Sequence, residues 1–381
     1  SRHGRRHYCF VQADEQRQGR GKEGYPRHRL ISGENTVNAL ASGEITSTGN
    51  VNVSALDDST VYTRGGTLDA TLPLTIITIT GVVNVDKFIK TVNAKVESAI
   101  INAADVLVSA SSVNSIGGTK KPDGTYDILK LTSDNYRTIL LNKNENGFAQ
   151  NSAFKNWNMF YDLTFGSKAT GSGTVVVKNV TNKVNAEVIK SEINANNLSV
   201  VADDYSIKNI IAGEIDASVK GGVNGTVMTT KDESTINATV RDGSVVTLNN
   251  DLNVMARTKK DNIEVVVAGG GAGFAEIHAN VVTNNTNDTT TAKIDSGSII
   301  DARNSVNVNA LNDVNATRVL FSGGGSTAVA INVEPLLNSY TGTTTASIIS
   351  STINNAAINL YGHDSVTNLD IGSGISGVAQ G

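Results

Sequence analysis

The chain has 381 residues, with 32 Lys and Arg against 36 Asp and Glu, 36 Gly, four Pro and a single Cys. One Cys excludes a disulfide scaffold and a cysteine-based metal cluster, and no apolar run approaches the length of a membrane-spanning helix. The slightly acidic balance argues against nucleic-acid binding, which needs a basic stripe. Abundant Val, Ile, Thr, Asn, Gly and Ala favour β-structure with many strands and tight corners.

Residues 1–30 differ in composition from everything that follows, because they are rich in Arg and His and contain the only Cys. They form either a basic arm for anionic surfaces or a cloning remnant or out-of-frame translation, and we favour the second interpretation. No apolar signal-peptide segment lies near Ser1. We therefore expect the sequence from Ile31 onward to be an internal piece of a longer protein.

A 54-residue repeat organises the C-terminal half of the chain. Ala238 to Ala256 reads ATVRDGSVVTLNNDLNVMA, and Ala292 to Ala310 reads AKIDSGSIIDARNSVNVNA without a gap. A third copy begins at Ala346, and weaker copies begin further upstream, at Ala94 and Ala186. Gly-Gly-Gly and Thr-Thr-Thr triplets recur at the same spacing, which indicates a true structural repeat.

The repeat predicts a parallel β-helix. Alternation of apolar and polar residues, as in Val306 to Ala310, is typical of strands, and we expect strands of three to five residues separated by short turns. Equivalent residues of successive coils should stack about 4.8 Å apart. At roughly 18 to 27 residues per coil, a repeat would be two or three coils, and the whole a rod roughly 60 to 90 Å long. Asn should serve at the corners, where it tolerates left-handed backbone angles.

One segment lacks the repeat and is rich in aromatic residues. We predict β-helix coils over residues 31–118, an insertion with its own small core over 119–170, and β-helix with the 54-residue repeats over 171–381. The insertion is either a binding surface or only packs its rings onto the coils below. As candidate partner-contact residues we select five of its aromatic residues: Tyr126, Tyr136, Phe154, Trp157 and Tyr161.

We find no pattern for a catalytic, cofactor-binding or metal site. The glycine run Gly269 to Gly273 lacks the Asp of a calcium-binding β-roll, so we expect glycine triplets to let neighbouring coils approach closely. The carboxylate pairs Asp57-Asp58 and Asp203-Asp204 have no evident Lys or Arg partner on the next repeat and are expected in solvated turns. His278 and His363 are isolated and are expected at the surface.

The blocks VNVNA, IIDA and TTTA, and the triplet Gly-Gly-Gly followed by Ala328 to Val333, resemble large bacterial exoproteins of the filamentous-haemagglutinin type. These proteins are exported by two-partner secretion and include fusobacterial leukotoxins and related adhesins. The resemblance implies a right-handed parallel β-helix, a secreted or cell-surface location, a protein or glycan receptor on the host cell, and an outer-membrane secretion partner for the full-length protein. The Asn-Pro-Asn type motif of the family's export domain is absent from this sequence.

Three functions remain open from the sequence. The first is a fragment of a virulence exoprotein, leukotoxin or adhesin, that acts by host-cell contact without catalysis. The alternative is a carbohydrate-active enzyme, a polysaccharide lyase or hydrolase, on the same fold. The third is a directly membrane-damaging toxin, against which the lack of apolar segments argues.

Overall fold

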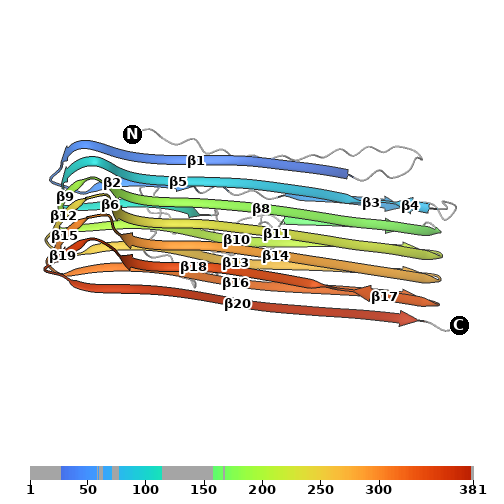
Figure 1. The fold of residues 1–381 in the computed structure, drawn as a ribbon. Helices are drawn as coiled ribbons and strands as arrows, with labels where there is room; N and C mark the ends of the chain where they lie inside the picture. The colour runs from blue at the N-terminus through green and yellow to red at the C-terminus, as the bar shows by residue number, and fades with distance from the viewer. Residues whose placement is uncertain are drawn as a thin grey trace, which may run out of the picture.

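The computed structural model describes residues 27–57, 59, 63–70, 77–113, 158–165 and 168–378. Within these ranges every helix or strand is a β-strand, and every strand pair is parallel (Figure 1). The all-β class that the composition predicts is therefore confirmed. Parallel pairing requires that each strand return by a crossover before it meets its neighbour, which is what a stacked repeat provides.

The strands form two sheets. The first, sheet A, holds β1 (Arg27–Thr46), β4 (Ile77–Ile79), β5 (Val82–Asn102), β8 (Ala169–Ile189), β9 (Glu192–Ala195), β11 (Gly221–Arg241), β12 (Val245–Leu248), β14 (Ala275–Ile294), β15 (Ile299–Ala302), β17 (Val329–Val333), β18 (Leu336–Ile348) and β19 (Thr352–Asn354). The second, sheet B, holds β2 (Val51–Asp57), β3 (Arg64–Ala70), β6 (Asp105–Val113), β7 (Asn158–Phe165), β10 (Asn197–Ser218), β13 (Leu252–Ala272), β16 (Ser305–Ser326) and β20 (Ala357–Val378). The segment Arg27–Leu30, which we had grouped with the anomalous start, is thus part of a strand.

Each 54-residue repeat makes one circuit of the molecule. The chain runs along a long strand of sheet A, through a short strand at one end, and back along a long strand of sheet B, as β11, β12 and β13 do before β14 begins (Figure 1). Gly221 is in register with Ala275, and Leu252 with Val306, each 54 residues on. The expectation of two or three coils per repeat is wrong. The long strands, at about 3.3 Å per residue, make the molecule longer along its strands than along the stack, so the predicted long rod is also wrong.

Equivalent residues of successive repeats lie over one another, as predicted. Ala94, Ala186, Ala238, Ala292 and Ala346 occupy one column of sheet A. The two glycine triplets and the two threonine triplets are likewise in register. Together with buried Val, Leu and Ile from both sheets, the alanine column builds the larger apolar core, which lies next to the short strands. Ala fits where the two sheets converge because it adds little volume.

Asparagine side chains form ladders along the stack. The side-chain amide of Asn237 donates to Asn185 at 2.9 Å, Asn185 donates to Asn93 at 2.9 Å, and Asn93 donates to Asn38 at 2.8 Å. An amide has both a donor and an acceptor, so identical residues satisfy each other when stacked. Ladders on the strands thus account for part of the abundance of Asn, which we had expected from the corners.

The corner between each long strand of sheet A and the short strand that follows it uses other residues. Residues with positive φ turn the chain there: Gly43, Ser98, Lys190, Asp242 followed by Gly243, Ser296 followed by Gly297, and Ser350. A serine follows nearby and closes the corner, since the Ser244 hydroxyl donates to the Arg241 carbonyl and Ser298 to Asp295, each at 2.7 Å. Asn does stand, as expected, at the next corner, between each short strand and sheet B, where Asn249 donates to Asn196 at 2.9 Å. The corner residues there include Asn196, Asn249, Asn250, Asn304 and Asn355, and Asn355 also has positive φ.

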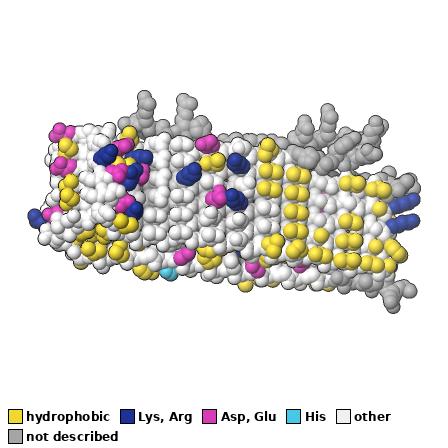
Figure 2. Space-filling view, viewed as in Figure 1, with side chains coloured by type: hydrophobic (Ala, Val, Ile, Leu, Met, Phe, Trp, Pro, Cys, Tyr) yellow, Lys and Arg dark blue, Asp and Glu magenta, His cyan; other side chains and the backbone are white. Residues whose placement is uncertain are grey.

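Toward the end of the molecule away from the short strands, the burial pattern of the strands is inverted, so that polar side chains point inward and apolar ones outward. In β14, Glu276, His278 and Asn280 point inward and are buried, while Ile277 and the small or apolar residues beside it point outward. Val223, Ile79 and Ile331 share the outward column of Ile277. Figure 2 shows such hydrophobic side chains aligned across the strands, away from the end of the short strands. The two sheets therefore enclose polar side chains and expose apolar ones over this part.

Replacement of Leu252 by Ala tests the larger core. Leu252 is fully buried in β13, so Leu252→Ala should lower the free energy of unfolding by about 2 to 5 kcal/mol. Val245→Ala is the matched control, because Val245 is 39% exposed and should change stability by less than about 1 kcal/mol. Urea unfolding followed by circular dichroism measures both. Equal effects would show that Leu252 is not in a packed core.

Candidate functional site

The two strands that flank residues 114–157 both pair with β10, within a short stretch of that strand. β6 ends at Val113, opposite Tyr205 of β10, and β7 begins at Asn158, opposite Ile210 of the same strand. These two points are about 17 Å apart at the rise of a β-strand. Between β5 and β8 the register spacing is 92 residues instead of 54, as expected if an extra segment enters one circuit.

Of the five candidate contact residues, the structure describes only Tyr161. It lies in β7, on the outer side of sheet B, and is 46% exposed. Residues 158–165 and Ala169 onward belong to the sheets, so this part of the predicted insertion is not separate from the coils. The other four candidates, Tyr126, Tyr136, Phe154 and Trp157, lie outside the described residues.

Tyr161 belongs to an apolar outer surface. A Cβ on Gly66, its neighbour in β3, would come within 2.4 Å of the Tyr161 ring, so glycine there lets the ring lie flat across the strand. Phe165, four residues further along β7, is also exposed, as are Ile215 of β10 and Phe321 of β16. Tyr161, Phe165 and Ile215 lie on one face of the neighbouring strands β7 and β10, and Phe321 lies on the same face two strands further on, across β13. We call these four exposed residues, Tyr161, Phe165, Ile215 and Phe321, the apolar patch of sheet B.

An ion pair stands where the segment leaves the sheet. The Arg257 guanidinium donates to both carboxylate oxygens of Asp203, at 2.6 and 2.8 Å, and lies 5.6 Å from the Tyr205 ring centroid. Arg257 is in register with Asp203, one repeat on. Two expectations are therefore wrong, since Asp203 has an Arg partner on the next repeat and is buried. Burial raises the pKa of Asp203, an effect that Arg257 opposes.

The adjacent Asp204 points to the opposite side of β10, between the sheets, and is also fully buried. It accepts hydrogen bonds from the Asn182 amide at 3.1 Å and from the Ser234 hydroxyl at 2.7 Å. Asp57 is buried as well and accepts from the Ser59 backbone at 2.8 Å. The predicted solvated turns are therefore wrong for these residues, while Asp58 lies outside the described residues.

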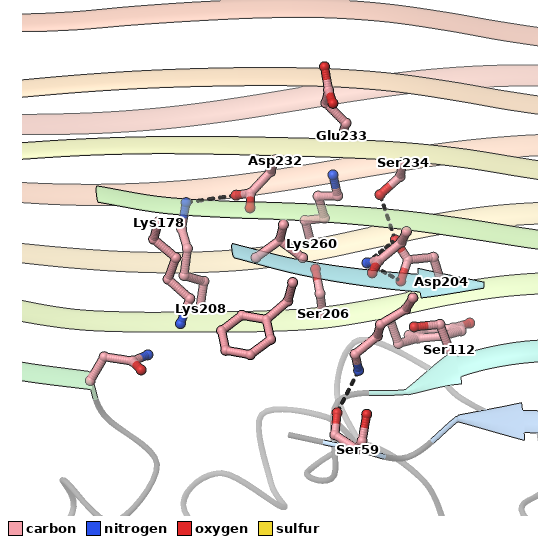
Figure 3. Close-up of a pocket in the computed structure, with 16 residues that line it drawn as sticks. Ser59, Ser112, Lys178, Asp204, Ser206, Lys208, Asp232, Glu233, Ser234 and Lys260 are labelled. Carbon is pink, nitrogen blue, oxygen red and sulfur yellow. Dashed lines mark hydrogen bonds and ion pairs between the residues drawn. The ribbon is translucent and has the colours of Figure 1, made fainter. Parts of the chain in front are cut away.

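A layer of charged side chains crosses the interior between the larger apolar core and a second, smaller apolar cluster. Lys208 donates to Asp232 at 2.7 Å and lies 2.8 Å from Glu264, whose other oxygen is 3.0 Å from Arg318. Figure 3 shows Lys208 reaching across to Asp232, and Ser234 to Asp204. We call this group the charged layer, and its members are Lys178, Asp204, Lys208, Asp232, Lys260, Glu264, Asp288 and Arg318. All of them are buried.

Sequence reasoning missed the charged layer although a signal was present. Extending the alternation of Leu252, Val254 and Ala256 by two residues at a time places Lys260 and Glu264 on the inner face. The same extension would have predicted His278 inside rather than at the surface. We had stopped the alternation where the apolar residues ended.

Part of this layer lines a cavity of about 80 Å³, together with Ser59, Lys90, Asn158 and Ser206. Lys178 faces it, and burial lowers the pKa of Lys178 to about 8, with Asp86 opposing the shift. A volume of this size admits a few water molecules but not a sugar chain. Its acids and amines face the interior between the sheets.

A second polar group lies in the inverted part of the strands. His278 Nε2 is 3.0 Å from Glu276 Oε1, and both side chains are buried. A Cβ on Gly270 would lie 2.2 Å from Glu276 Oε1, and one on Gly324 would lie 2.8 Å from His278 Nε2. These two triplet glycines therefore make room for side chains of the facing sheet. His363, in contrast, is exposed as expected and stacks on Tyr361.

Two findings bear on other kinds of site. No group of three or more His, Cys, Asp or Glu in the described part of the chain has an arrangement that could hold a metal ion. Over the same part, no helix has the length and apolar character needed to cross a membrane. Comparisons with protein-family models, with curated proteins and with solved structures gave no match.

The acids in the inverted part predict a pH dependence. Burial raises the pKa of Glu214 to about 8, the Gly225 backbone lowers it, and Asp162 and Asp216 raise it further. Between the ordinary value of 4.5 and about 8, the folded chain holds a proton that the unfolded chain has released. The free energy of unfolding should therefore fall as pH rises from about 5 to about 8.

The variant Glu214→Gln should flatten that profile, because it carries no titrating group at this position. Urea unfolding at several pH values measures the profile. Glu233→Gln is the control, because Glu233 lies on the outer face of sheet A and is partly exposed. This variant should leave the wild-type slope unchanged. Below about pH 6 the raised pKa values of Asp216 and Asp288 also contribute, so the decisive range is pH 6 to 8, and a wild-type slope that survives there in Glu214→Gln contradicts the assignment.

Proposed function

We propose that this chain is part of a secreted or surface-exposed bacterial exoprotein of the leukotoxin or adhesin type, which acts by contact with host cells and without catalysis. Its repeats form a right-handed parallel β-helix with wide, flattened coils. The observation that carries this proposal is the register of one 54-residue repeat upon the next in two parallel sheets. Parallel crossovers are right-handed in nearly all proteins, which supports the handedness.

The proposed contact surface is the apolar patch of sheet B, together with the segment that leaves and rejoins the sheet beside it. Exposed aromatic side chains on a rigid sheet lose little conformational entropy when they bind a partner. The Asp203–Arg257 ion pair stabilises sheet B near the end of β6. Along β10 this point is about 17 Å from the place where β7 begins. A protein or glycan receptor on the host cell is the proposed partner.

Export by two-partner secretion belongs to the same proposal, with an outer-membrane partner serving the full-length protein. The only Cys of the chain is Cys9, so no disulfide within the chain would oppose passage in the unfolded state. Each repeat contacts mainly its neighbours, so folding can propagate circuit by circuit outside the cell. Folding outside would then oppose return.

A carbohydrate-active enzyme is the weaker proposal. Such an enzyme presents its acids and bases on an exposed face where a sugar chain can lie. Here the closely grouped acids Asp204, Asp232 and Asp288 point between the sheets and are buried. A screen of polysaccharides for released reducing ends or unsaturated products separates the two proposals, because a contact protein should release none.

The double variant Tyr161→Ser, Phe165→Ser tests the contact surface. Loss of two exposed rings should weaken binding to host cells by about tenfold or more, measured by flow cytometry with labelled protein. Tyr361→Ser is the matched control, because Tyr361 is 53% exposed on β20, outside the patch. Circular dichroism should remain dominated by β-structure in both variants. Unchanged binding in the double variant would remove the patch from the proposal.

A further inference from the structure

Lys260 and Asp288 are in contact inside the molecule, in the charged layer. Lys260 Nζ lies 2.5 Å from Asp288 Oδ1, and their side chains are 2% and 0% exposed. Lys260 comes from β13 of sheet B and Asp288 from β14 of sheet A, so the pair joins the two sheets. The second oxygen of Asp288, Oδ2, has no hydrogen-bond partner among the described residues.

From this geometry we propose that Lys260 and Asp288 condense to an intramolecular isopeptide bond. The neutral amine of Lys260 attacks Cγ of the protonated Asp288 carboxyl, so that an N–C bond forms. The C–O bond to the carboxyl hydroxyl then breaks, and one water molecule leaves with the proton that the amine gives up. Charge is conserved, because the ion pair and the amide are both neutral overall, and no oxidant or other reactant is needed.

The interior favours this reaction for three reasons. A buried ion pair carries a desolvation cost that a neutral amide does not. The two reacting groups are held at contact distance, which raises their effective concentration by several orders of magnitude. Burial also raises the pKa of Asp288 to about 6, Lys260 opposes the shift, and Asp204 and Asp232 add to it, so the protonated carboxyl is accessible near neutral pH.

Asp204 is the carboxylate placed to carry the proton. It accepts the Ser234 hydroxyl at 2.7 Å, and Ser234 is in register with Asp288 on the adjacent strand. On the other sheet, Asp204 is two residues from Ser206, which is in register with Lys260. Asp204 therefore lies one circuit before the reacting pair, and its charge acts on Asp288. Its assigned role is to take the proton from nitrogen and give it to the leaving hydroxyl.

The other lysine pairs do not share these properties. Lys208 has two carboxylates and the Thr230 hydroxyl as partners, and although burial lowers its pKa, Asp232 and Glu264 raise it more, so its amine stays protonated. Lys259 is 3.0 Å from Asp313, but that carboxylate is 40% exposed, so water competes with the amine. Among these three lysines only Lys260 combines burial with a single carboxyl partner.

The test is the intact mass of the purified full chain. We expect a mass lower than that of the sequence by one water molecule. Tryptic digestion should give one branched peptide that joins the two segments through Lys260 and Asp288, with no cleavage after Lys260. A mass equal to that of the sequence overturns the proposal, and so does a branched peptide through any other lysine.

Variants confirm the assignment. Lys260→Arg and Asp204→Asn should each restore the full mass of their own sequence, the first because the nucleophile is lost and the second because proton transfer is lost. Lys259→Arg is the matched control and should still lack one water molecule. Because the wild-type mass decides the question, a variant that fails to fold does not affect the outcome. The inference does not rest on the proposed contact function, since a chain that binds no cell can still carry the bond.

Discussion

The structure depends on one constraint: every residue lies beside its counterpart one repeat away in the sequence. A parallel ladder between circuits fixes that neighbour, so each side chain must tolerate a copy of its own position. Ala, Val and Asn can be stacked on themselves, and they fill the columns of the core and the ladders. Charged residues cannot, and in one column of the charged layer they alternate in sign instead. Glu264, Arg318 and Asp370 follow one another across β13, β16 and β20, with Arg318 in contact with both acids.

The same constraint explains what could be predicted from the sequence. The repeat, the all-β class and the stacking of equivalent residues follow from spacing alone, and the alanine column confirms them. The size of a circuit could not be read, because stretches such as Thr286 to Thr291 are polar on both faces and hide the alternation of a long strand. The Asp203–Arg257 pair was predictable, since the two residues are one repeat apart. The partners of Lys208 could not be predicted from the sequence, because they depend on how the two sheets face each other.

The inverted part of the strands shows that alternation alone does not tell which face is inside. In β14 the sequence Ala275 to Val281 alternates as regularly as the core segment Val306 to Ala310, yet its polar residues are the buried ones. Position in the circuit decides this, because a strand keeps its pleat from one end to the other and the apolar core near the short strands sets the phase. The apolar residues on the outside of this part are then available for contact with a partner.

The charged layer has a role that the apolar columns cannot fill. A slip of one strand by two residues would leave Ala over Val or Val over Ala in the core, which costs little. The same slip of β16 would move Arg318 away from Glu264 and break a buried ion pair, which is strongly unfavourable. Omission of a whole circuit would bring β13 beside β20 and place Glu264 against Asp370, two like charges. Apolar columns therefore give the stack its stability, and we infer that the charged layer selects its register.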